Sequence, residues 1–284
     1  MTTIASTAKA VSFSVMASAG PGPNYVTVGY SLSGSGSEQT LVRAVGPTLA
    51  EFNVPRPLPD PVLSLFDDQF QLIASNSGWG GQARLADAFA ATGAFALAPT
   101  SRDDALLETL STGNYTVQAG SASGAAGLVL VELYDADHNQ STAHLSNLSV
   151  LAQVDTQGVS LYAGFVIVGT EPQPVLLRAV GPTLAHLGLA HALVAPQLTL
   201  LDGSGRAIAT CAPWGKEPLP GPSPIQAEPA AATESVMAET GAFPLMENSR
   251  DAAMIVTLPP GQYSVEVSGA PGDRGYALFE YYEL

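Results

Sequence analysis

The stretch LVRAVGPTLA at residues 41–50 recurs as LLRAVGPTLA at residues 176–185, with nine of the ten positions identical. Self-similarity of this kind indicates an internal repeat, and the offset here is 135 residues (176 − 41). The match continues at the same offset beyond this stretch, because Trp79 corresponds to Trp214. We therefore expect two copies of one domain in tandem.

The second copy is longer than the first because of one insertion. Beyond the tryptophans the offset rises to 148, so that TGAF at 92–95 matches TGAF at 240–243. The 13 additional residues (148 − 135) belong to a proline-rich stretch at about 216–228. The expected organisation is a first repeat, a short polar linker and a second repeat, at residues 1–137, 138–143 and 144–284.

Within each copy the apolar segments are short, alternating or β-branched, and separated by Gly, Pro, Asn and Asp, a pattern typical of strands. One segment of the first copy, 83–92, has helical spacing instead, and its counterpart lies at about 230–240. The sequence predicts an all-β fold of two tandem homologous antiparallel β-sandwiches, jelly-roll-like, each with one short helix. The strands expected in the first copy are 10–17, 25–32, 39–45, 61–67, 70–75, 104–110, 114–120 and 126–134.

Charge and hydropathy exclude several classes of partner. With 25 acidic against 10 basic residues the net charge is −15, which disfavours binding to nucleic acid or to an anionic lipid surface. No run of 18 apolar residues exists, so no membrane insertion is expected. Cys211 is the only cysteine, so no disulfide can form within the chain.

The N-terminus does not have the pattern of a secretory signal peptide. The first twenty residues lack a charged start and a continuous apolar centre, and residues 10–15 alternate as in a strand. Two explanations stay open: the numbering describes a processed chain behind an added Met1, or export uses another route.

Catalytic motifs are missing from the sequence. There is no Gly-x-Ser-x-Gly elbow, His-Glu-x-x-His motif or P-loop. None of the four histidines, His138, His144, His186 and His191, has a counterpart in the first copy. We expect the protein not to be an enzyme.

Arg43 and Arg178 each lie within an apolar strand, where a charge is costly unless it is paired. A ligand-binding role is one interpretation, but two acidic positions recur together with the arginines, which favours structural buried ion pairs. The candidate partners are Asp103 and Asp251, or Glu132 and Glu280.

The aromatic residues suggest contacts as well as core packing. Trp79 and Trp214 recur in both copies and are best explained at the edge of the core, although an exposed tryptophan would suit stacking against sugars. Tyr281 and Tyr282, in the apolar C-terminal strand, are suited to a subunit contact. A glycan-binding role would require an exposed aromatic platform, for instance at Trp79, Tyr25 or Tyr30.

Acidic residues of the first copy could supply oxygen ligands to calcium. The second copy has Ala195, Gly203 and Ala252 at three of the equivalent positions, so a shared site is not expected. Calcium binding by the first repeat alone stays open, and no other cofactor is expected. The acids concerned are Asp60, Asp67, Asp68, Asp103 and Asp104.

Two groups of segments resemble known families. The LVRAVGPTL run resembles a tandem repeat of large, secreted, Ala/Gly-rich bacterial surface proteins. Segments of the later part of each copy, PVLSLFD (61–67), LIASN (72–76) and GNYTV (113–117), are similar to the bacterial pre-peptidase C-terminal-like β-sandwich, a non-catalytic domain appended to secreted enzymes. These resemblances imply an extracellular β-sandwich without catalytic activity and carry over no functional residues.

The function expected from these observations is a self-assembling subunit of a bacterial surface filament, sheath or layer. The N-terminal strand, with Val11, Phe13 and Val15, is tethered at one end only and could complete the sheet of a neighbouring copy. The partner would then be the protein itself, as a homopolymer. The alternatives are a glycan-binding or adhesion module and an accessory module of a secreted protein.

Overall fold

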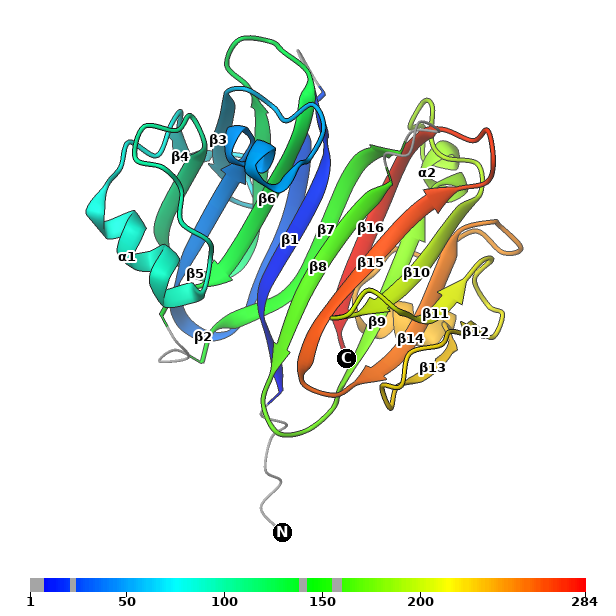
Figure 1. The fold of residues 1–284 in the computed structure, drawn as a ribbon. Helices are drawn as coiled ribbons and strands as arrows, with labels where there is room; N and C mark the ends of the chain where they lie inside the picture. Colours follow the sequence, from blue (N-terminus) through cyan, green and yellow to red (C-terminus); the bar gives the residue numbers. More distant parts are fainter. Residues whose placement is uncertain (1–7, 21–23, 138–141, 155–159) are drawn as a thin grey trace. The chain divides into compact units, whose positions relative to one another are not determined.

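The computed structural model describes residues 8–20, 24–137, 142–154 and 160–284, which form mostly β-strands (Figure 1). The chain divides into two compact units: Val11–Ser146, called the first unit below, and Asn147–Leu284 with the residues before Val11, called the second unit. Of the linker expected at 138–143, residues 138–141 lie outside the described residues.

The first unit alternates long strands with short helical segments (Figure 1). Its elements are β1 (Lys9–Ala19), β2 (Val26–Val45), the 3-10 helix η1 (Pro47–Phe52), β3 (Pro61–Phe66), β4 (Leu72–Asn76), α1 (Ala83–Thr92), β5 (Asp104–Ser121) and β6 (Gly127–Asp135).

Antiparallel pairing joins these strands into two rows that share β2 and β5. One row is β1–β6–β2–β5 and the other is β2–β5–β3–β4. Residues 26–32 of β2 pair with 113–119 of β5, and residues 37–44 pair with 104–111, with an irregular register between. Four separate strands were expected here. The structure has two, because the polar Ser/Gly stretch between Leu32 and Glu38 changes the register without ending the strand.

The second unit repeats this order, but two shorter strands stand in place of each of β2 and β5. Its elements are β7 (His144–Val154), β8 (Leu161–Val168), β9 (Gln173–Val180), α2 (Pro182–His186), β10 (Pro196–Asp202), β11 (Ala207–Cys211), β12 (Leu219–Pro220), β13 (Glu228–Ala231), α3 (Glu234–Glu239), β14 (Ala252–Leu258), β15 (Gly261–Gly269) and β16 (Gly275–Glu283).

The pairing in the second unit also forms two antiparallel rows. They are β7–β16–β9–β14–β13 and β8–β15–β10–β11–β12. Strands β8 and β9 take the places of the two halves of β2, and β14 and β15 take those of β5. Strands β12 and β13 have no counterpart among the described strands of the first unit. They come from, or directly follow, the proline-rich insertion at 216–228.

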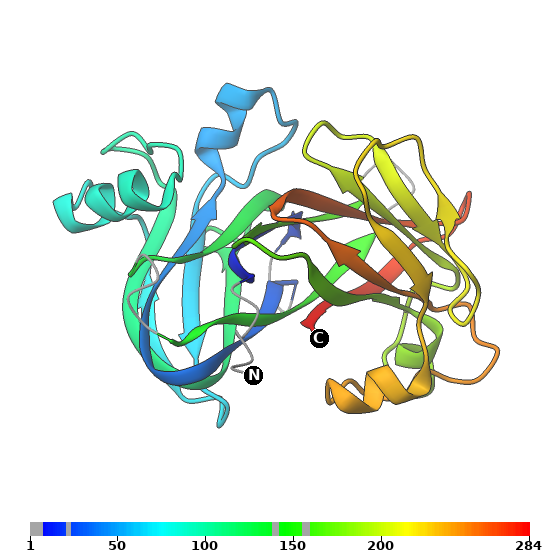
Figure 2. The same ribbon diagram turned by 90° about the horizontal axis from the view of Figure 1, so that it is seen from below.

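The helices correct one expectation. α1 has the bounds that the sequence predicted, and α3 lies within the predicted 230–240. The expectation of one helix per copy was wrong, because η1 and α2 begin at the prolines of the repeated Gly-Pro-Thr. Proline suits the first turn of a helix, where its missing N–H would have no intrahelical partner. In the first unit, η1 and α1 both lie at the periphery, on the outer side of the strands (Figure 2). No helix among the described residues is long and apolar enough to cross a membrane.

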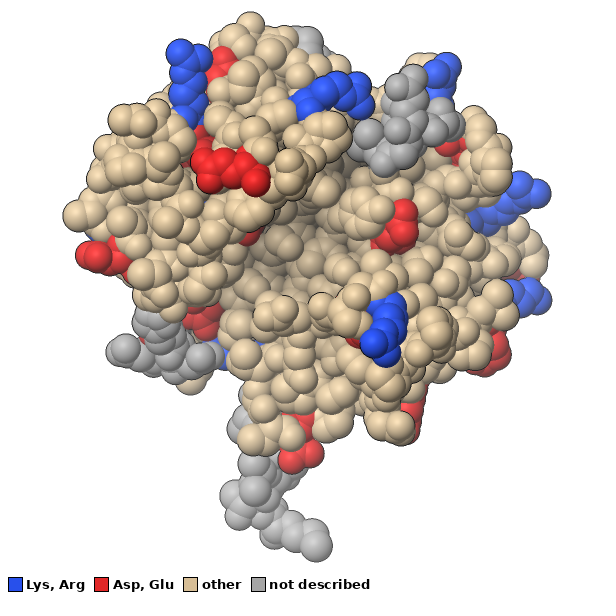
Figure 3. All heavy atoms as spheres, viewed as in Figure 1, with Lys and Arg blue, Asp and Glu red and all other residues tan. Residues whose placement is uncertain are grey.

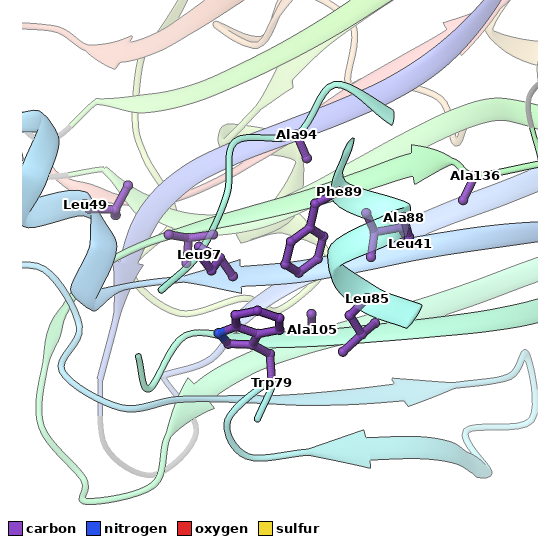
Figure 4. Packing of buried hydrophobic residues seen from close by; sticks show 11 residues of the cluster. Leu41, Leu49, Trp79, Leu85, Ala88, Phe89, Ala94, Leu97, Ala105 and Ala136 are labelled. Carbon is purple, nitrogen blue, oxygen red and sulfur yellow. The ribbon is translucent and has the colours of Figure 1, made fainter. Parts of the chain in front are cut away.

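Each unit has a buried cluster between its strands and one of its helices, α1 or α3. In the first unit Leu85 and Phe89 of α1 pack with Trp79 and with Leu41 of β2 (Figure 4). In the second unit Met237 of α3 packs in a similar cluster with residues of β9. The helical spacing in the sequence is therefore explained by one apolar face that covers the strands.

Candidate functional site

The guanidinium of Arg43 is enclosed by three kinds of contact. Arg43 is fully buried on β2, directly across the ladder from Glu132 on β6, and its Nε lies 3.1 Å from Oε2 of Glu132. Its Nη1 donates a hydrogen bond of 2.8 Å to the carbonyl oxygen of Phe95. The guanidinium carbon also lies 4.4 Å and 4.6 Å from the ring centres of Phe95 and Phe89, a cation–π geometry.

The second unit builds the same arrangement around Arg178. This side chain is fully buried on β9, opposite Glu280 of β16, and its Nε lies 3.0 Å from Oε2 of Glu280. Its Nη1 donates to the carbonyl oxygen of Phe243 at 2.8 Å, and the ring centre of Phe243 lies 4.4 Å from the guanidinium carbon.

A tyrosine completes each ion pair. The hydroxyl of Tyr134 donates to Oε1 of Glu132 at 2.7 Å, and that of Tyr282 donates to Oε1 of Glu280 at 2.6 Å. Burial raises the pKa of the Glu132 carboxyl, while the charge of Arg43 and the hydrogen bond from Tyr134 oppose the rise. In each glutamate one carboxylate oxygen faces the arginine and the other accepts from the tyrosine, so the carboxylates of Glu132 and Glu280 are not available to a ligand.

The other repeated acid has a different role. Asp103 is fully buried and holds the turn after β2, because its Oδ1 accepts from the N–H groups of Gly46 at 2.7 Å and Thr48 at 3.3 Å. Its Oδ2 accepts a hydrogen bond from the Thr48 hydroxyl. Glycine is needed at position 46, since a β-carbon there would overlap the carbonyl oxygen of Leu58.

Asp251 does the same in the second unit. Its Oδ1 accepts from Gly181 N–H at 2.7 Å, and its Oδ2 accepts from the Thr183 and Ser249 hydroxyls at 2.5 Å and 2.6 Å. Of the two acids that the sequence offered as partners of the arginines, the structure therefore places the glutamate against the arginine and the aspartate at the turn.

The tryptophans anchor the loop that carries these aspartates. Trp79 is only 2% exposed, and its Nε1 donates to the carbonyl oxygen of Ala98 at 3.0 Å and to Oγ of Ser101 at 3.2 Å. Trp214 is partly buried and donates to Met246 and Ser249 in the same way, at 3.1 Å each. Neither ring forms a sugar-stacking surface.

Two of the remaining aromatic candidates, Tyr281 and Tyr30, lie inside the protein. Tyr281 is fully buried, and its strand β16 lies between β7 and β9, so the C-terminal strand has no free edge for a subunit contact. Tyr30 is buried and stacks on Tyr115 with ring centres 5.5 Å apart. Of the three rings named for a glycan platform, only Tyr25 is exposed.

The candidate assembly strand is paired within its own unit. Residues 12–19 of β1 pair with 127–134 of β6, and Phe13 and Val15 are buried while Val11 is half-buried. Exchange of this strand would require it to leave the ladder with β6.

The acids considered for calcium bind parts of their own unit instead. Asp67 accepts from the N–H groups of Gln69 and Gln71 in the β3–β4 hairpin, and Oδ1 of Asp60 accepts from the Ser121 hydroxyl at 2.8 Å. Asp104 is buried and accepts from Leu63 N–H at 2.9 Å and Ala105 N–H at 2.8 Å. Across the described ranges, no three His, Cys, Asp or Glu side chains lie together in a way that could hold a metal ion.

One feature of the surface was not anticipated, namely the edge formed by β4. Phe70, Leu72 and Ile73 are exposed there, and within the described part of the chain β4 pairs with β3 alone. Charged side chains are scattered singly on the face seen in Figure 3, among uncharged ones. The first copy has no segment equivalent to the 216–228 insertion of the second copy. This difference was the sequence signal that the edge of β4 lacks a cover.

The equivalent strand of the second unit is covered. Thr210 and Ala209 of β11 pair with Leu219 and Pro220 of β12. The insertion continues along β11, because Gly221 N–H donates to Ile208 at 2.8 Å and Ser223 N–H donates to Ala207 at 3.0 Å.

No protein-family model matches the chain, and no curated protein matches it. Among solved structures, the chain is similar to a DUF4785 family protein from Legionella pneumophila, at 12% identity and a TM-score of 0.23, over 98% of this chain and 83% of that one.

Proposed function

We propose that this protein is a non-catalytic, extracellular structural subunit that self-associates into a filament, sheath or layer at the bacterial surface. In this proposal the two units are tandem homologous β-sandwich repeats of jelly-roll type. The matching environments of Arg43 and Arg178, of Asp103 and Asp251, and the matching strand order support that homology. Extracellular placement rests on the resemblance of the repeat to secreted surface proteins.

The observation that carries the proposal is the uncovered β4 edge. A strand edge with free backbone groups and apolar side chains is a template for pairing with another chain. Folded proteins usually blunt such edges with lysine, proline or a covering segment. The second unit does so with its insertion, whereas Phe70, Leu72 and Ile73 of the first unit remain exposed.

The occupant that we propose for this edge is a second copy of the chain. A segment of this same chain already adds to the equivalent edge at β11, so the backbone geometry of this hairpin accepts a further strand. Contact between the β4 edge of one copy and a different surface of the next would be head-to-tail, which builds a filament unless the rotation closes a ring. Most polar groups that recur in the two repeats are used internally, which supports a structural role over a catalytic one.

Exchange of the N-terminal strand is a second route to the same assembly, and it can be tested separately. Val15 of β1 is the direct neighbour of Val131 on β6. A disulfide between Val15→Cys and Val131→Cys would hold β1 in its own unit. If the oxidised variant still assembles, addition at β4 is supported; if assembly stops and returns after reduction, strand exchange is the mechanism.

A further inference from the structure

The second unit contains a pocket of about 380 Å³ that the proposed assembly does not use. One charged side chain, Arg250, lines it, and the rest of the wall is formed by small residues, prolines and one glutamine. The lining residues are Ala195, Pro196, Gln197, Ala212, Pro213, Arg250, Gly269, Ala270 and Pro271.

The first unit has polar side chains at the equivalent positions. At the sequence offsets of 135 and 148, Ala195 corresponds to Asp60 and Gly269 to Ser121, and Arg250 corresponds to Arg102. The Ser121 hydroxyl donates to Oδ1 of Asp60 at 2.8 Å. Although burial acts in the opposite direction, hydrogen bonds from Ser123 and Ser121 and the charge of Arg102 hold the pKa of Asp60 below its ordinary value. In the first unit, therefore, the carboxylate of Asp60 is hydrogen-bonded by two serines and lies close enough to Arg102 to feel its charge.

In the second unit the arginine is kept, but the carboxylate and the two serines at the equivalent positions are lost. Asp60 is replaced by Ala195, and the two serines are replaced by Gly269 and Pro271. All three replacements line the pocket. Arg250 is exposed, and within the described ranges it has no ion pair. The nearby carboxylate of Asp273 accepts from the N–H groups of Val194 and Ala195, at 2.9 Å and 2.8 Å.

We propose that this pocket binds a small organic carboxylate, whose acid group takes the place that Asp60 holds in the first unit and pairs with Arg250. Arginine suits this role because its planar guanidinium can donate two parallel hydrogen bonds to a carboxylate. The apolar body of the ligand would pack on Pro196, Pro213 and Pro271. The volume lies at the small end of the range for ligand pockets, roughly 300–1,000 Å³, which fits a molecule of about one ring.

The test uses the full-length protein with cyclohexanecarboxylate as the probe and cyclohexanecarboxamide as its uncharged control. Binding would be measured by titration calorimetry and by chemical shifts in two-dimensional NMR spectra. The expected result is saturable binding of the carboxylate with shifts at the pocket residues. Binding of the amide should be at least ~10-fold weaker, because one hydrogen-bonded charge pair is lost.

Three variants make the assignment specific. Arg250→Gln should weaken carboxylate binding by about tenfold or more, whereas the matched Arg102→Gln in the first unit should leave it unchanged. Ala195→Asp should also abolish binding, because it restores the carboxylate of the first unit, and the first unit shows that this fold accepts aspartate there. Equal binding of acid and amide, binding insensitive to Arg250→Gln, or no saturable binding of the carboxylate would each overturn the proposal.

Discussion

Ile73 of β4 and Ile208 of β11 occupy equivalent positions in the two repeats, yet Ile73 is 40% exposed and Ile208 only 6%. Both lie at the same register shift of their hairpins, since Ala74 pairs with Leu65 as Ala209 pairs with Leu200. The difference coincides with the segment that runs along β11 and has no counterpart beside β4. The two edges thus form an internal comparison between a covered and an uncovered strand.

The first prediction concerns the segment that covers β11. Gly221 lies so close to β11 that a β-carbon there would overlap the carbonyl oxygen of Ala207. Gly221→Val should therefore detach the insertion and expose the β11 edge, and the protein should self-associate at lower concentration than the wild type. Light scattering over a concentration series measures this, with Gly205→Val at the open β10–β11 turn as a control for general loss of stability. Unchanged association of Gly221→Val would show that the insertion does not protect this edge.

The second prediction concerns the buried ion pair of the first unit. Arg43→Met should lower the free energy of unfolding by about 3–5 kcal/mol, because it leaves the Glu132 carboxylate buried without its partner. The double variant Arg43→Met with Glu132→Leu should recover most of that loss, since an apolar pair of similar volume avoids the cost of desolvating two charges. Urea denaturation provides the measurement. A double variant as unstable as the single one would mean that the pair contributes net stability beyond its own desolvation cost.

The third prediction concerns Asp104, whose counterpart in the second unit is Ala252. Burial raises the pKa of Asp104 to about 6, although hydrogen bonds from Leu63, Ala105 and Gly78 N–H groups act against the shift. The folded state therefore binds this proton more readily than the unfolded chain. Its contribution to stability is present at low pH and is lost as pH rises from about 4 to about 6.

The size of that effect follows from the shift. A change of about two pKa units corresponds to roughly 3 kcal/mol, so the wild type should lose stability across this window by up to that amount relative to Asp104→Asn. Denaturation curves of the two proteins at half-unit pH steps measure the difference. A difference that is constant from pH 4 to pH 7 would show that Asp104 does not titrate in this range.

The sequence predicted local features well and cross-strand features poorly. The helix at 83–92 was found with its observed bounds because Leu85, Ala88 and Phe89 form one apolar face over adjacent turns, which is local information. The arginines were expected to be paired, but the choice between Glu132 and Asp103 depended on the register of β2 against β6, which spacing along the chain does not encode. η1 was not predicted, because the helical role of Pro47 at its first position depends on the turn that Gly46 makes after β2.

The missing counterpart of the insertion pointed to the β4 edge, but the residue pattern of β4 itself did not predict its exposure. Leu72 and Ile73 have the composition of a strand that packs on one face, and only the pairing shows that nothing among the described residues covers them. The pocket at Arg250 required the same step, because its substitutions are informative only once Asp60, Ser121 and Arg102 are seen to lie together.

The central claim is tested most directly by the assembly state of Ile73→Lys. Lysine on an exposed edge position should cost less than ~0.5 kcal/mol of stability while discouraging strand addition. The measurement is light scattering with negative-stain electron microscopy of the full-length protein at rising concentration, and Val194→Lys, an exposed apolar position of the second unit, is the matched control. Our account predicts that the wild type and Val194→Lys form regular polymers and that Ile73→Lys remains monomeric. A wild type that stays monomeric at every concentration would contradict the proposed assembly, and an Ile73→Lys variant that polymerises like the wild type would contradict the role of the β4 edge.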